Sequence, residues 1–313
     1  MSEILFSVVI ACYKQEGFVR QAVESALSQG HSSKEIIVVD DASPDGTGDV
    51  LSTFGDSITL ARLTVNGGAL AARNHGSSLA RGKYLVFLDG DDALMSGALD
   101  VYARLIDERS PKIIFGHSVI CHGEIPEEKT AEGPRDIQFV EYENFLSKDR
   151  PCLFNTSTLV VERSAFWAAG GWSPEIFYQD IQDLLTKMGV AGKMILVLAP
   201  DTVWYRMHGA NTVNKVAPFL DGIHVLLGKS KAGLYPGGRE IWLERSAWFG
   251  GLIFYWTKTA MQARLYRDAF VLLATGWWMI LLAIVRRGTA RIVGRRPIEI
   301  LRLEPRKAKT LAV

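Results

Sequence analysis

The segment from Gly82 to Asp92 constrains the fold of this chain more than any other part of the sequence. It contains Tyr84–Leu88, a run that is nearly all apolar and is bracketed by Gly82 and Gly90. An apolar run without alternation is typical of a strand buried on both faces of a parallel sheet. The run ends in three carboxylates within four residues, those of Asp89, Asp91 and Asp92. Because ligands of open α/β sheets collect beyond the carboxyl ends of strands, we expect the functional edge of the protein here.

The type and spacing of these carboxylates favour a metal ion and a diphosphate. Asp89 and Asp91 stand two residues apart, so on extended backbone their side chains can point to one side. Mg²⁺ and Mn²⁺ prefer hard carboxylate oxygens and usually take phosphate oxygens as well. The alternative is an acidic turn that caps the following helix, because Asp is common at turns and helix N-termini.

The residues before this segment predict a right-handed parallel unit. Apolar runs at Phe6–Ala11, Glu35–Val39 and around Ile58–Thr64 predict strands, and helical spacing over Phe18–Leu27 and Ala69–Ala80 predicts two of the helices between them. Strands and helices that alternate in this way form a parallel sheet, with loops for a nucleotide where each strand meets the next helix.

Polar residues in two of these loops are candidates for nucleotide binding. Asp40 and Asp41 could accept a hydrogen bond from a uracil imide or from ribose hydroxyls, although simple helix capping would also place Asp there. The glycines at Gly67 and Gly68 permit close approach of the backbone. Arg73 could reach a diphosphate with its planar guanidinium group, although an Arg on a helix is more often solvated.

Four motifs in this order resemble the inverting family 2 glycosyltransferases of the GT-A fold. They are Ser7–Tyr13, Glu35–Thr47, Asn66–Asn74 and Gly82–Asp92. One departure is visible, because the family often has Pro and Asn near the end of the first strand, where this chain has Ala11 and Lys14. The departure concerns the contacts to the donor base rather than the fold.

The resemblance implies a set of roles for individual residues. The uracil pocket would be lined by Ala11, Tyr13 and Asp41, with Asp40 and Gly68 also at the nucleotide. Arg73 and Asn74 would lie near the nucleotide. The metal-and-diphosphate motif would consist of Asp89, Gly90, Asp91 and Asp92.

The resemblance extends through Asn155–Phe166 and Gly170–Trp172 to the place of the family's catalytic acid pair. The usual Glu-Asp is here Gln179-Asp180, so Asp180 inherits the role of general base. Apolar residues at helical spacing predict a buried helix that begins at Asp180, and the dipole of that helix would favour the ionised carboxylate. Asp183 is the alternative base, and a plain helix N-cap is the structural alternative for Asp180.

The segment Trp204–Asn211 resembles a Tyr-Arg-x-His-Gly-Asn stretch of the same family. The resemblance implies that His208 ligates the metal or touches the diphosphate and that Arg206 stabilises phosphate charge. A lone His is otherwise more often structural. The polar segment Val119–Arg150 predicts a long surface connection, a natural place for acceptor contacts.

The C-terminal region differs in character from the rest of the chain. The formal net charge is +1, yet eleven Lys and Arg against three Asp and Glu follow from Arg264 onward. Within this region, Ala269–Val285 is apolar, contains Trp277 and Trp278, and precedes a group of arginines: Arg286, Arg287, Arg291, Arg295 and Arg296. Seventeen uncharged residues are borderline for a membrane span, so we expect an interfacial helix on anionic headgroups, while the choice between spanning and lying flat stays open. A buried helical hairpin packed on the catalytic body is the alternative.

Cysteine usage and the N-terminus predict a cytoplasmic catalytic body. Cys12, Cys121 and Cys152 show neither metal-ligand spacing nor an even disulfide set, which fits a reducing compartment. The first residues lack the basic region of a signal peptide.

The combined prediction is an α/β nucleotide-diphospho-sugar transferase of GT-A fold with a mostly parallel, Rossmann-like sheet. Residues 1–215 would form the catalytic domain, with a nucleotide half at 1–115 and an acceptor half at 116–215, and residues 216–313 a helical, membrane-associating region. The enzyme would use Mn²⁺ or Mg²⁺ to move a hexosyl or N-acetylhexosaminyl group from a UDP-sugar to a hydroxyl of a saccharide or lipid-linked saccharide in cell-surface polysaccharide synthesis. It would work at the cytoplasmic face of the cell membrane, without nucleic acid.

Two other classes of protein compete with this prediction. A non-catalytic scaffold subunit that binds sugar nucleotides draws support from Gln179, where an acid is common. A nucleotidyltransferase is weakened because no Gly-rich loop with Lys and Arg follows the first strand to hold a triphosphate.

Overall fold

A computed structural model describes residues 4–126, 135–146, 155–176, 178–209, 211, 216–238, 241–293 and 296–303. Within these residues, ten strands form one mixed sheet. Its order is β10-β7-β9-β6-β8-β4-β1-β2-β3, with β5 paired to β9. Two apolar layers lie on its two faces, because successive residues of a buried strand point to opposite sides.

The N-terminal half of the sheet is parallel and carries the nucleotide-type loops. Its strands are β1 (Phe6–Cys12), β2 (Lys34–Asp40), β3 (Thr59–Arg62) and β4 (Tyr84–Asp89). The helices that follow its strands are α1 (Val19–Leu27), α2 (Thr47–Ser52), α3 (Ala69–Leu79) and, beyond the short strand β5 (Ala93–Leu94), α4 (Ala98–Arg109); a short 3-10 helix, η1 (Gly55–Ser57), precedes β3. Helices α1, α2 and α4 pack on one face of the sheet and α3 on the other, so the expected α/β architecture is confirmed.

The other half of the sheet is mixed rather than parallel. It contains β6 (Ile113–His122), β7 (Arg135–Tyr142), β8 (Leu159–Glu162), β9 (Met194–Met207) and β10 (Glu299–Leu303). Strand β8 is antiparallel to both β4 and β6, and β7 is antiparallel to β9 and β10. The expectation of a mostly parallel sheet therefore holds for the first half only.

The predicted surface connection over Val119–Arg150 is wrong in part. The end of β6 and all of β7 lie in this range, and β7 pairs with both β9 and β10. Residues 127–134 and 147–150 of this connection lie outside the described residues. The remaining elements of this half are η2 (Thr156–Thr158), α5 (Arg163–Ala168) and α6 (Asp180–Met188).

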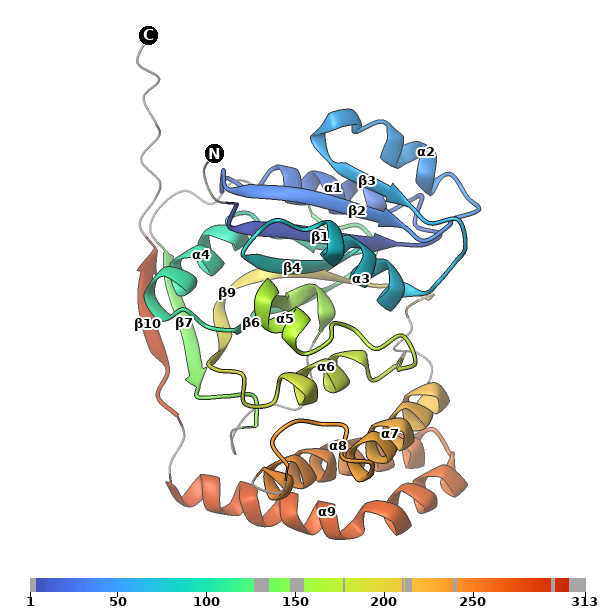
Figure 1. The fold of residues 1–313 in the computed structure, drawn as a ribbon, viewed down its shortest axis with the longest axis vertical. Helices are drawn as coiled ribbons and strands as arrows, with labels where there is room; N and C mark the ends of the chain where they lie inside the picture. Colours follow the sequence, from blue (N-terminus) through green and yellow to red (C-terminus); the bar gives the residue numbers. More distant parts are fainter. Residues whose placement is uncertain are drawn as a thin grey trace.

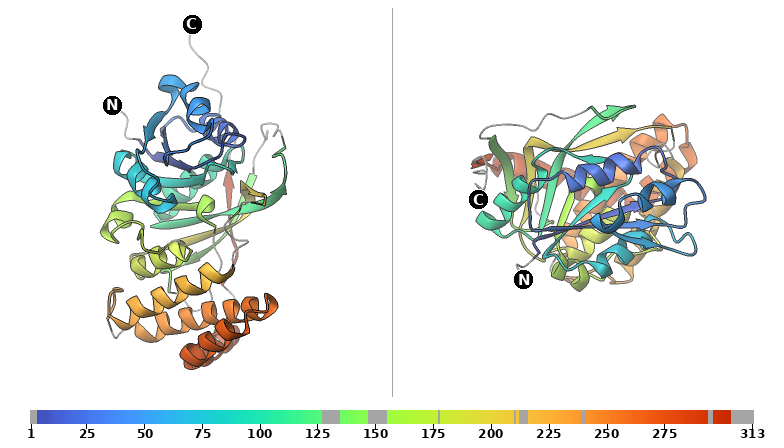
Figure 2. Two further views of the ribbon diagram at one scale, coloured as in Figure 1. Left: turned by 90° about the vertical axis from the view of Figure 1, so that its right-hand side faces the viewer. Right: turned by 90° about the horizontal axis from the view of Figure 1, so that it is seen from above.

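Three long helices form a layer at one end of the molecule (Figure 1, Figure 2). They are α7 (Val216–Lys231), α8 (Trp242–Gln262) and α9 (Tyr266–Val293). Their inner side chains belong to the same apolar cluster as α3, α5 and α6. After α9 the chain returns to the sheet as β10, so residues 216–313 are not wholly helical, and the division at residue 215 stays a prediction.

Helix α9 is the described helix that is long and apolar enough to cross a membrane. The stretch Tyr266–Gly288 has a mean hydropathy of 2.0, and 28% of its most apolar window is buried inside the protein. The helix therefore packs on the body with one side and leaves much of its apolar surface exposed.

Candidate active site

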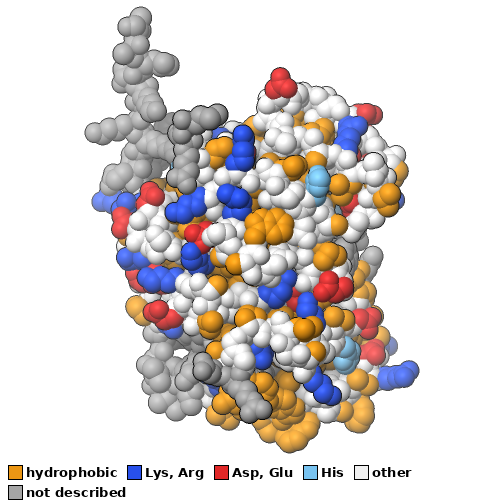
Figure 3. All heavy atoms as spheres, viewed as in Figure 1, with side chains coloured by type: hydrophobic (Ala, Val, Ile, Leu, Met, Phe, Trp, Pro, Cys, Tyr) orange, Lys and Arg blue, Asp and Glu red, His pale blue; other side chains and the backbone are white. Residues whose placement is uncertain are grey.

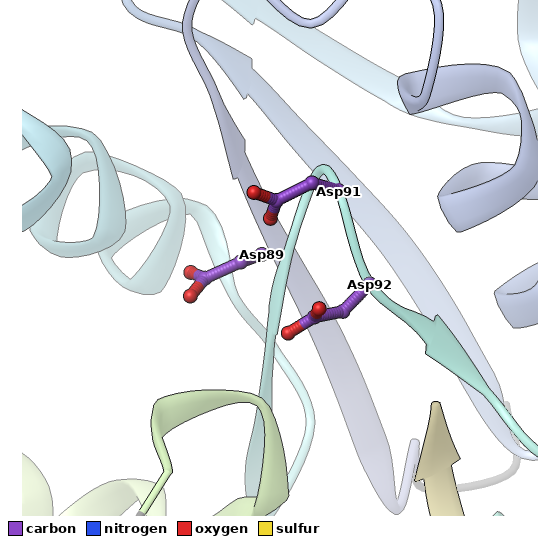
Figure 4. Close-up of side chains that lie close together, drawn as sticks. All are labelled: Asp89, Asp91 and Asp92. Carbon is purple, nitrogen blue, oxygen red and sulfur yellow. The ribbon is translucent and has the colours of Figure 1, made fainter. Parts of the chain in front are cut away.

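Three carboxylates gather at the turn after β4 (Figure 4). Asp89 ends the strand, Asp91 stands in the turn and Asp92 follows it, and their ligand oxygens all lie within 4.8 Å of one another. Gly90 permits this turn, because a Cβ at that position would lie 2.8 Å from the Cβ of Cys12, the last residue of β1. The backbone therefore folds closely against the end of β1 and presents the carboxylates together.

Asp91 faces His208, which follows β9. His208 Nε2 and Asp91 Oδ2 lie 2.9 Å apart, and the imidazole stacks on Phe18 with 5.0 Å between ring centroids. Burial raises the pKa of Asp91 and the negative charge of Asp89 raises it further, while the hydrogen bond with His208 opposes both. Carboxylates that repel one another in this way favour a cation between them, and the imidazole nitrogen is a further candidate ligand.

Asp92 is buried, and its carboxylate is already bonded within the protein. Ser157 Oγ donates to one oxygen, and the backbone N–H of Arg206 donates to the other over 2.9 Å. Burial raises the pKa of Asp92 well above its usual range, and the charges of Asp91 and Asp89 add to this effect. Asp92 therefore connects the turn to η2 and β9, and it has less capacity for a metal ion than its two neighbours.

Arg73 joins the carboxylate cluster to the predicted base. From α3, its Nη2 lies 2.6 Å from Asp89 Oδ1 and its Nη1 lies 2.9 Å from Asp180 Oδ2. The side chain is buried, and its guanidinium group lies over the ring of Trp172 at 5.5 Å. Burial lowers the pKa of Arg73, but the two carboxylates raise it by more, so the pKa is raised overall. The guanidinium fork is thus occupied by two carboxylates rather than solvated, and its contact with a diphosphate stays a prediction.

Asp180 is the first residue of α6, as the sequence predicts, but its acidity differs from the expectation. Burial raises the pKa of Asp180, and the Arg73 guanidinium offsets only part of that increase. The expected preference of the helix dipole for the ionised form is therefore outweighed by loss of solvent. A carboxylate with a raised pKa is a better proton acceptor near neutral pH than an ordinary Asp.

Asp183, the alternative base, belongs to a different network. Its oxygens accept hydrogen bonds from Ser173 Oγ at 2.6 Å and Tyr235 Oη at 2.7 Å, and Lys229 Nζ lies 3.0 Å away. Burial raises the pKa of Asp183, but these partners and Lys187 lower it by more, so the pKa is lowered overall. A fully buried carboxylate with this many donors stabilises the contact of α6 with α7 and the loop after it, and it is poorly suited to proton transfer.

Gln179 points away from the carboxylate cluster. Its Nε2 donates to the carbonyl of Phe219 in α7 over 3.1 Å, and its side chain packs against Gly222. A Glu here would place a carboxylate against a carbonyl oxygen. The amide at this position is therefore explained by the contact with α7.

Asp40 and Asp41 hold the loops that follow β2 and β3 through hydrogen bonds to their backbone N–H groups. Both are buried, and the two oxygens of Asp41 accept from the backbone N–H groups of Gly67 and Gly68, each over 2.8 Å. Asp40 Oδ1 accepts from the backbone N–H of Ser43. The predicted uracil contact of Asp41 would thus have to share oxygens that already hold the Gly67-Gly68 loop.

Asn74 and Arg206 are also occupied by protein partners. The amide of Asn74 exchanges two hydrogen bonds with the backbone of Trp172, at 2.9 and 3.0 Å. Each guanidinium nitrogen of buried Arg206 donates within the protein, to the carbonyls of Asp91 and Gly123 and to a Gln side chain. These donors brace the turn that carries Asp91, and the contact of Arg206 with phosphate stays a prediction.

The uracil-pocket candidates at the end of β1 differ in exposure. Ala11 is nearly buried, whereas Tyr13 is 40% exposed and has Lys14 Nζ 5.2 Å from its ring centroid. Tyr13 therefore offers an accessible aromatic face just beyond the carboxyl end of β1.

Two functional partners, Ser157 and Trp172, were missed by the sequence reasoning. Ser157 also accepts the backbone N–H of Asp89 over 3.1 Å, so it holds both ends of the acidic turn. Both residues lie in segments that resemble the family, but no spacing rule connects them to Asp92 or Arg73.

Comparison with known proteins identifies the family. The profile of glycosyl transferase family 2 matches residues 7–169, more than half of the chain. The chain belongs to this family. Both the acidic turn and Arg73 lie within the matched range.

Two curated relatives show the extent of the similarity. The Bacillus subtilis protein TuaG, a putative teichuronic acid biosynthesis glycosyltransferase, is 33% identical over 139 residues, 43% of this chain and 55% of TuaG. The Escherichia coli protein WfaP, a UDP-Glc:α-D-GlcNAc-diphosphoundecaprenol β-1,3-glucosyltransferase, is 27% identical over 227 residues, 71% of this chain and 85% of WfaP. The match thus spans about half the length of TuaG and most of WfaP.

A solved structure agrees with the fold. The crystal structure of Staphylococcus aureus TarS 1–349 in complex with UDP-GlcNAc superposes with a TM-score of 0.61 at 16% identity, over 79% of this chain and 71% of that one. At this identity the comparison concerns the fold alone. The predicted GT-A fold is confirmed.

Proposed function

We propose that this family member transfers a sugar from a nucleotide-diphospho-sugar to an acceptor hydroxyl in a single inverting displacement. The observation that carries the proposal is the bridge of Arg73 between Asp89 and Asp180. One guanidinium group connects the carboxylates that suit a diphosphate-bound metal to Asp180, a partly buried carboxylate whose pKa is raised. A donor at the first site and an acceptor at the second would meet beside this bridge.

The donor set fits Mg²⁺ or Mn²⁺. Asp91 and Asp89 supply hard oxygens, and His208 supplies an adjacent nitrogen. Asp92 would act mainly by positioning, because both of its oxygens already accept hydrogen bonds. A bound divalent ion would supply charge neutralisation for the diphosphate as it leaves.

Asp180 would accept the proton of the acceptor hydroxyl while that oxygen attacks the anomeric carbon. Its raised pKa brings it closer to the pH at which a base works well, and the bond to Arg73 holds the carboxylate in one orientation. Inversion needs no covalent sugar–enzyme intermediate, so one carboxylate base is sufficient. Tyr13, with its exposed ring, would stack on the donor base next to Ala11.

The substrate class follows from the relatives. The names of WfaP and of the TarS complex contain a UDP-sugar, and the acceptor in the name of WfaP is a diphosphoundecaprenol-linked sugar. We therefore propose a UDP-sugar donor and a lipid-linked saccharide acceptor in cell-surface polysaccharide synthesis. An acceptor of this kind requires work at a membrane surface, which fits the exposed apolar surface of α9, and we propose the cytoplasmic face.

The competing scaffold hypothesis loses its main support. It rested on Gln179, but that side chain contacts α7 and lies outside the group formed by Asp89, Arg73 and Asp180. The candidate base is Asp180, and it is present.

The decisive experiment compares Asp180→Asn with the unchanged protein. Asn keeps the shape of the side chain but cannot take a proton as a carboxylate does. We expect UDP release from a panel of UDP-sugars with extracted lipid acceptor to fall by about two to four powers of ten, while UDP affinity measured by calorimetry stays within a few-fold. Turnover near the original rate would place the base elsewhere, and UDP binding without turnover in the unchanged protein would favour the scaffold.

A further inference from the structure

The outer side of α9 carries a continuous apolar stripe, which we call the outer stripe. Its residues follow one another at intervals of three or four, so they lie on one face of the helix. They are Tyr266, Phe270, Leu273, Trp277, Leu281 and Ile284, with exposed fractions of 64%, 71%, 40%, 58%, 53% and 58%. At 1.5 Å per residue the outer stripe runs for about 27 Å. Figure 3 shows apolar side chains gathered at the end of the molecule where α9 lies.

The opposite side of α9 is packed tightly on α8. A Cβ on Gly250 of α8 would lie 1.9 Å from the carbonyl oxygen of Met279, and one on Gly276 would lie 2.4 Å from Ile253 Cδ1. Helix α8 in turn shares the apolar cluster of the catalytic body. The two helices and the body thus form one packed unit, and α9 cannot leave it without exposing the core.

The chain after α9 excludes a transmembrane path for this helix. Helix α9 ends at Val293, and β10 begins at Glu299 and pairs with β7. An ion pair over 2.7 Å between Arg109 Nη2 and Glu299 Oε2 holds the start of β10 in place. Six backbone steps reach at most about 22 Å, whereas the hydrocarbon core of a bilayer is about 30 Å thick. If α9 crossed, its C-terminal end would lie too far from the sheet for β10 to pair. Both ends of α9 must therefore lie on the side of the catalytic body.

The charges around the outer stripe select its partner. Between Phe254 and Gly288 the chain carries five basic residues and one acidic residue. Among the basic ones, Arg264 and Arg267 are exposed near one end of the outer stripe and Arg287 near the other. A second copy docked through the same face would bring arginines against arginines in either helix direction, whereas anionic headgroups would neutralise both ends.

We infer that α9 docks flat on an anionic bilayer surface, with the outer stripe inserted among the lipids and neither end crossing. Burial of aromatic and aliphatic side chains at the interface supplies the attraction, and the flanking arginines add selectivity for acidic lipid. The inference deepens the proposed membrane association and rests on it. In Figure 1, α9 lies at the base of the molecule. Docked through this helix, the catalytic sheet would stand above the membrane rather than beside a span.

Flotation of the full chain with vesicles tests the docking surface. The unchanged protein should float with phosphatidylglycerol vesicles and less with neutral phosphatidylcholine, and Phe270→Glu combined with Trp277→Glu should lower the partition coefficient by about a hundredfold or more. Val65→Glu is the matched control, because Val65 is 75% exposed in the loop before α3, and it should float like the unchanged protein. Equal flotation of the double variant, or no flotation of the unchanged protein, would overturn the inference. So would a dimer in solution that the double variant dissociates, since the occupant would then be a second copy.

Labelling from one side separates lying flat from crossing. In chains with Cys121 and Cys152 replaced by Ser, Met261→Cys precedes α9 and Ile298→Cys follows it, and both native side chains are more than half exposed. An impermeant maleimide added to inside-out membrane vesicles should label both positions equally. Protection of one position and labelling of the other would mean that α9 crosses. UDP affinity measured without vesicles reports on the proposed transferase separately, so loss of docking and loss of donor binding can be told apart.

Discussion

Replacing Arg73 by Met removes the cation that joins Asp89 to Asp180, and it should cost both stability and activity. Breaking a buried ion pair by removing one partner typically costs about 3–5 kcal/mol. Asp89 and Asp180 keep 28% and 18% of their side-chain surface exposed, so water can solvate them in part. We therefore expect a loss of roughly 2–3 kcal/mol in the free energy of unfolding, measured by urea denaturation.

The pH profile should change in a direction that a purely structural defect would not produce. The positive charge of Arg73 lowers the pKa of Asp180 against the larger effect of burial. Without it the pKa of Asp180 rises further, so the base is protonated up to a higher pH. The acidic limb of kcat/KM should move to higher pH, and the maximum rate should fall by about a hundredfold because the carboxylate is no longer held in place.

Arg104→Met is the matched control. Arg104 lies on α4 and pairs with Glu108 at 2.8 Å, but it is 41% exposed, so its loss should cost less than about 1 kcal/mol and leave the pH profile unchanged. Arg73→Lys should recover part of the stability, because the charge remains, but little of the rate, because one ammonium group cannot reproduce the planar fork. If Arg73→Met costs no more than Arg104→Met and leaves the acidic limb in place, the bridge does not act as described.

Three further outcomes are expected. Asp91→Ala should abolish Mn²⁺-dependent UDP binding in calorimetry while metal-independent binding remains, and unchanged Mn²⁺ dependence would exclude Asp91 as a ligand. Gln179→Glu should destabilise the protein by about 1–3 kcal/mol, because a carboxylate would face the Phe219 carbonyl; a variant of equal stability and higher turnover would show instead that the family's usual acid serves catalysis here. Because the pKa of Asp183 is lowered in the folded protein, its carboxylate stabilises the fold fully above its unfolded pKa of about 3.9, and this stability is lost as the pH falls through the lower folded pKa. The melting temperature of Asp183→Asn should therefore depend less on pH below about 4 than that of the unchanged protein. Equal acid sensitivity of the two proteins would contradict the buried network.

Local patterns were sufficient for the four parallel strands of the N-terminal half and for helices α1 and α3. The predicted strand Phe6–Ala11 is observed as Phe6–Cys12, and the predicted helix Ala69–Ala80 as Ala69–Leu79. Strands buried on both faces and helices with one apolar face leave a strong periodic signal, because every residue's environment follows from its position in the element. The acidic turn could be predicted for the same reason, since it directly follows such a strand.

The acceptor half was harder to predict. All six residues of β6 beyond Gly116 are exposed or partly exposed. Strand β7 lies between β9 and β10, and both of these neighbours are distant from it in the sequence. Such strands owe their conformation to neighbours supplied by the tertiary fold, so they carry little local signal. Strand β10 is the extreme case, because it pairs with a strand more than 150 residues earlier.

The sequence by itself determined which residues carry charge at the functional edge, and the tertiary structure decided what each charge faces. Asp89, Asp91 and Asp180 could be named from motif and position alone. That Arg73 binds Asp180, 107 residues away, and that Arg206 braces the acidic turn, depend on which elements the fold brings together. A side chain's type sets the bonds it is able to form, but its partner, burial and pKa depend on distant segments, and these are fixed only when the sheet and its helices have packed.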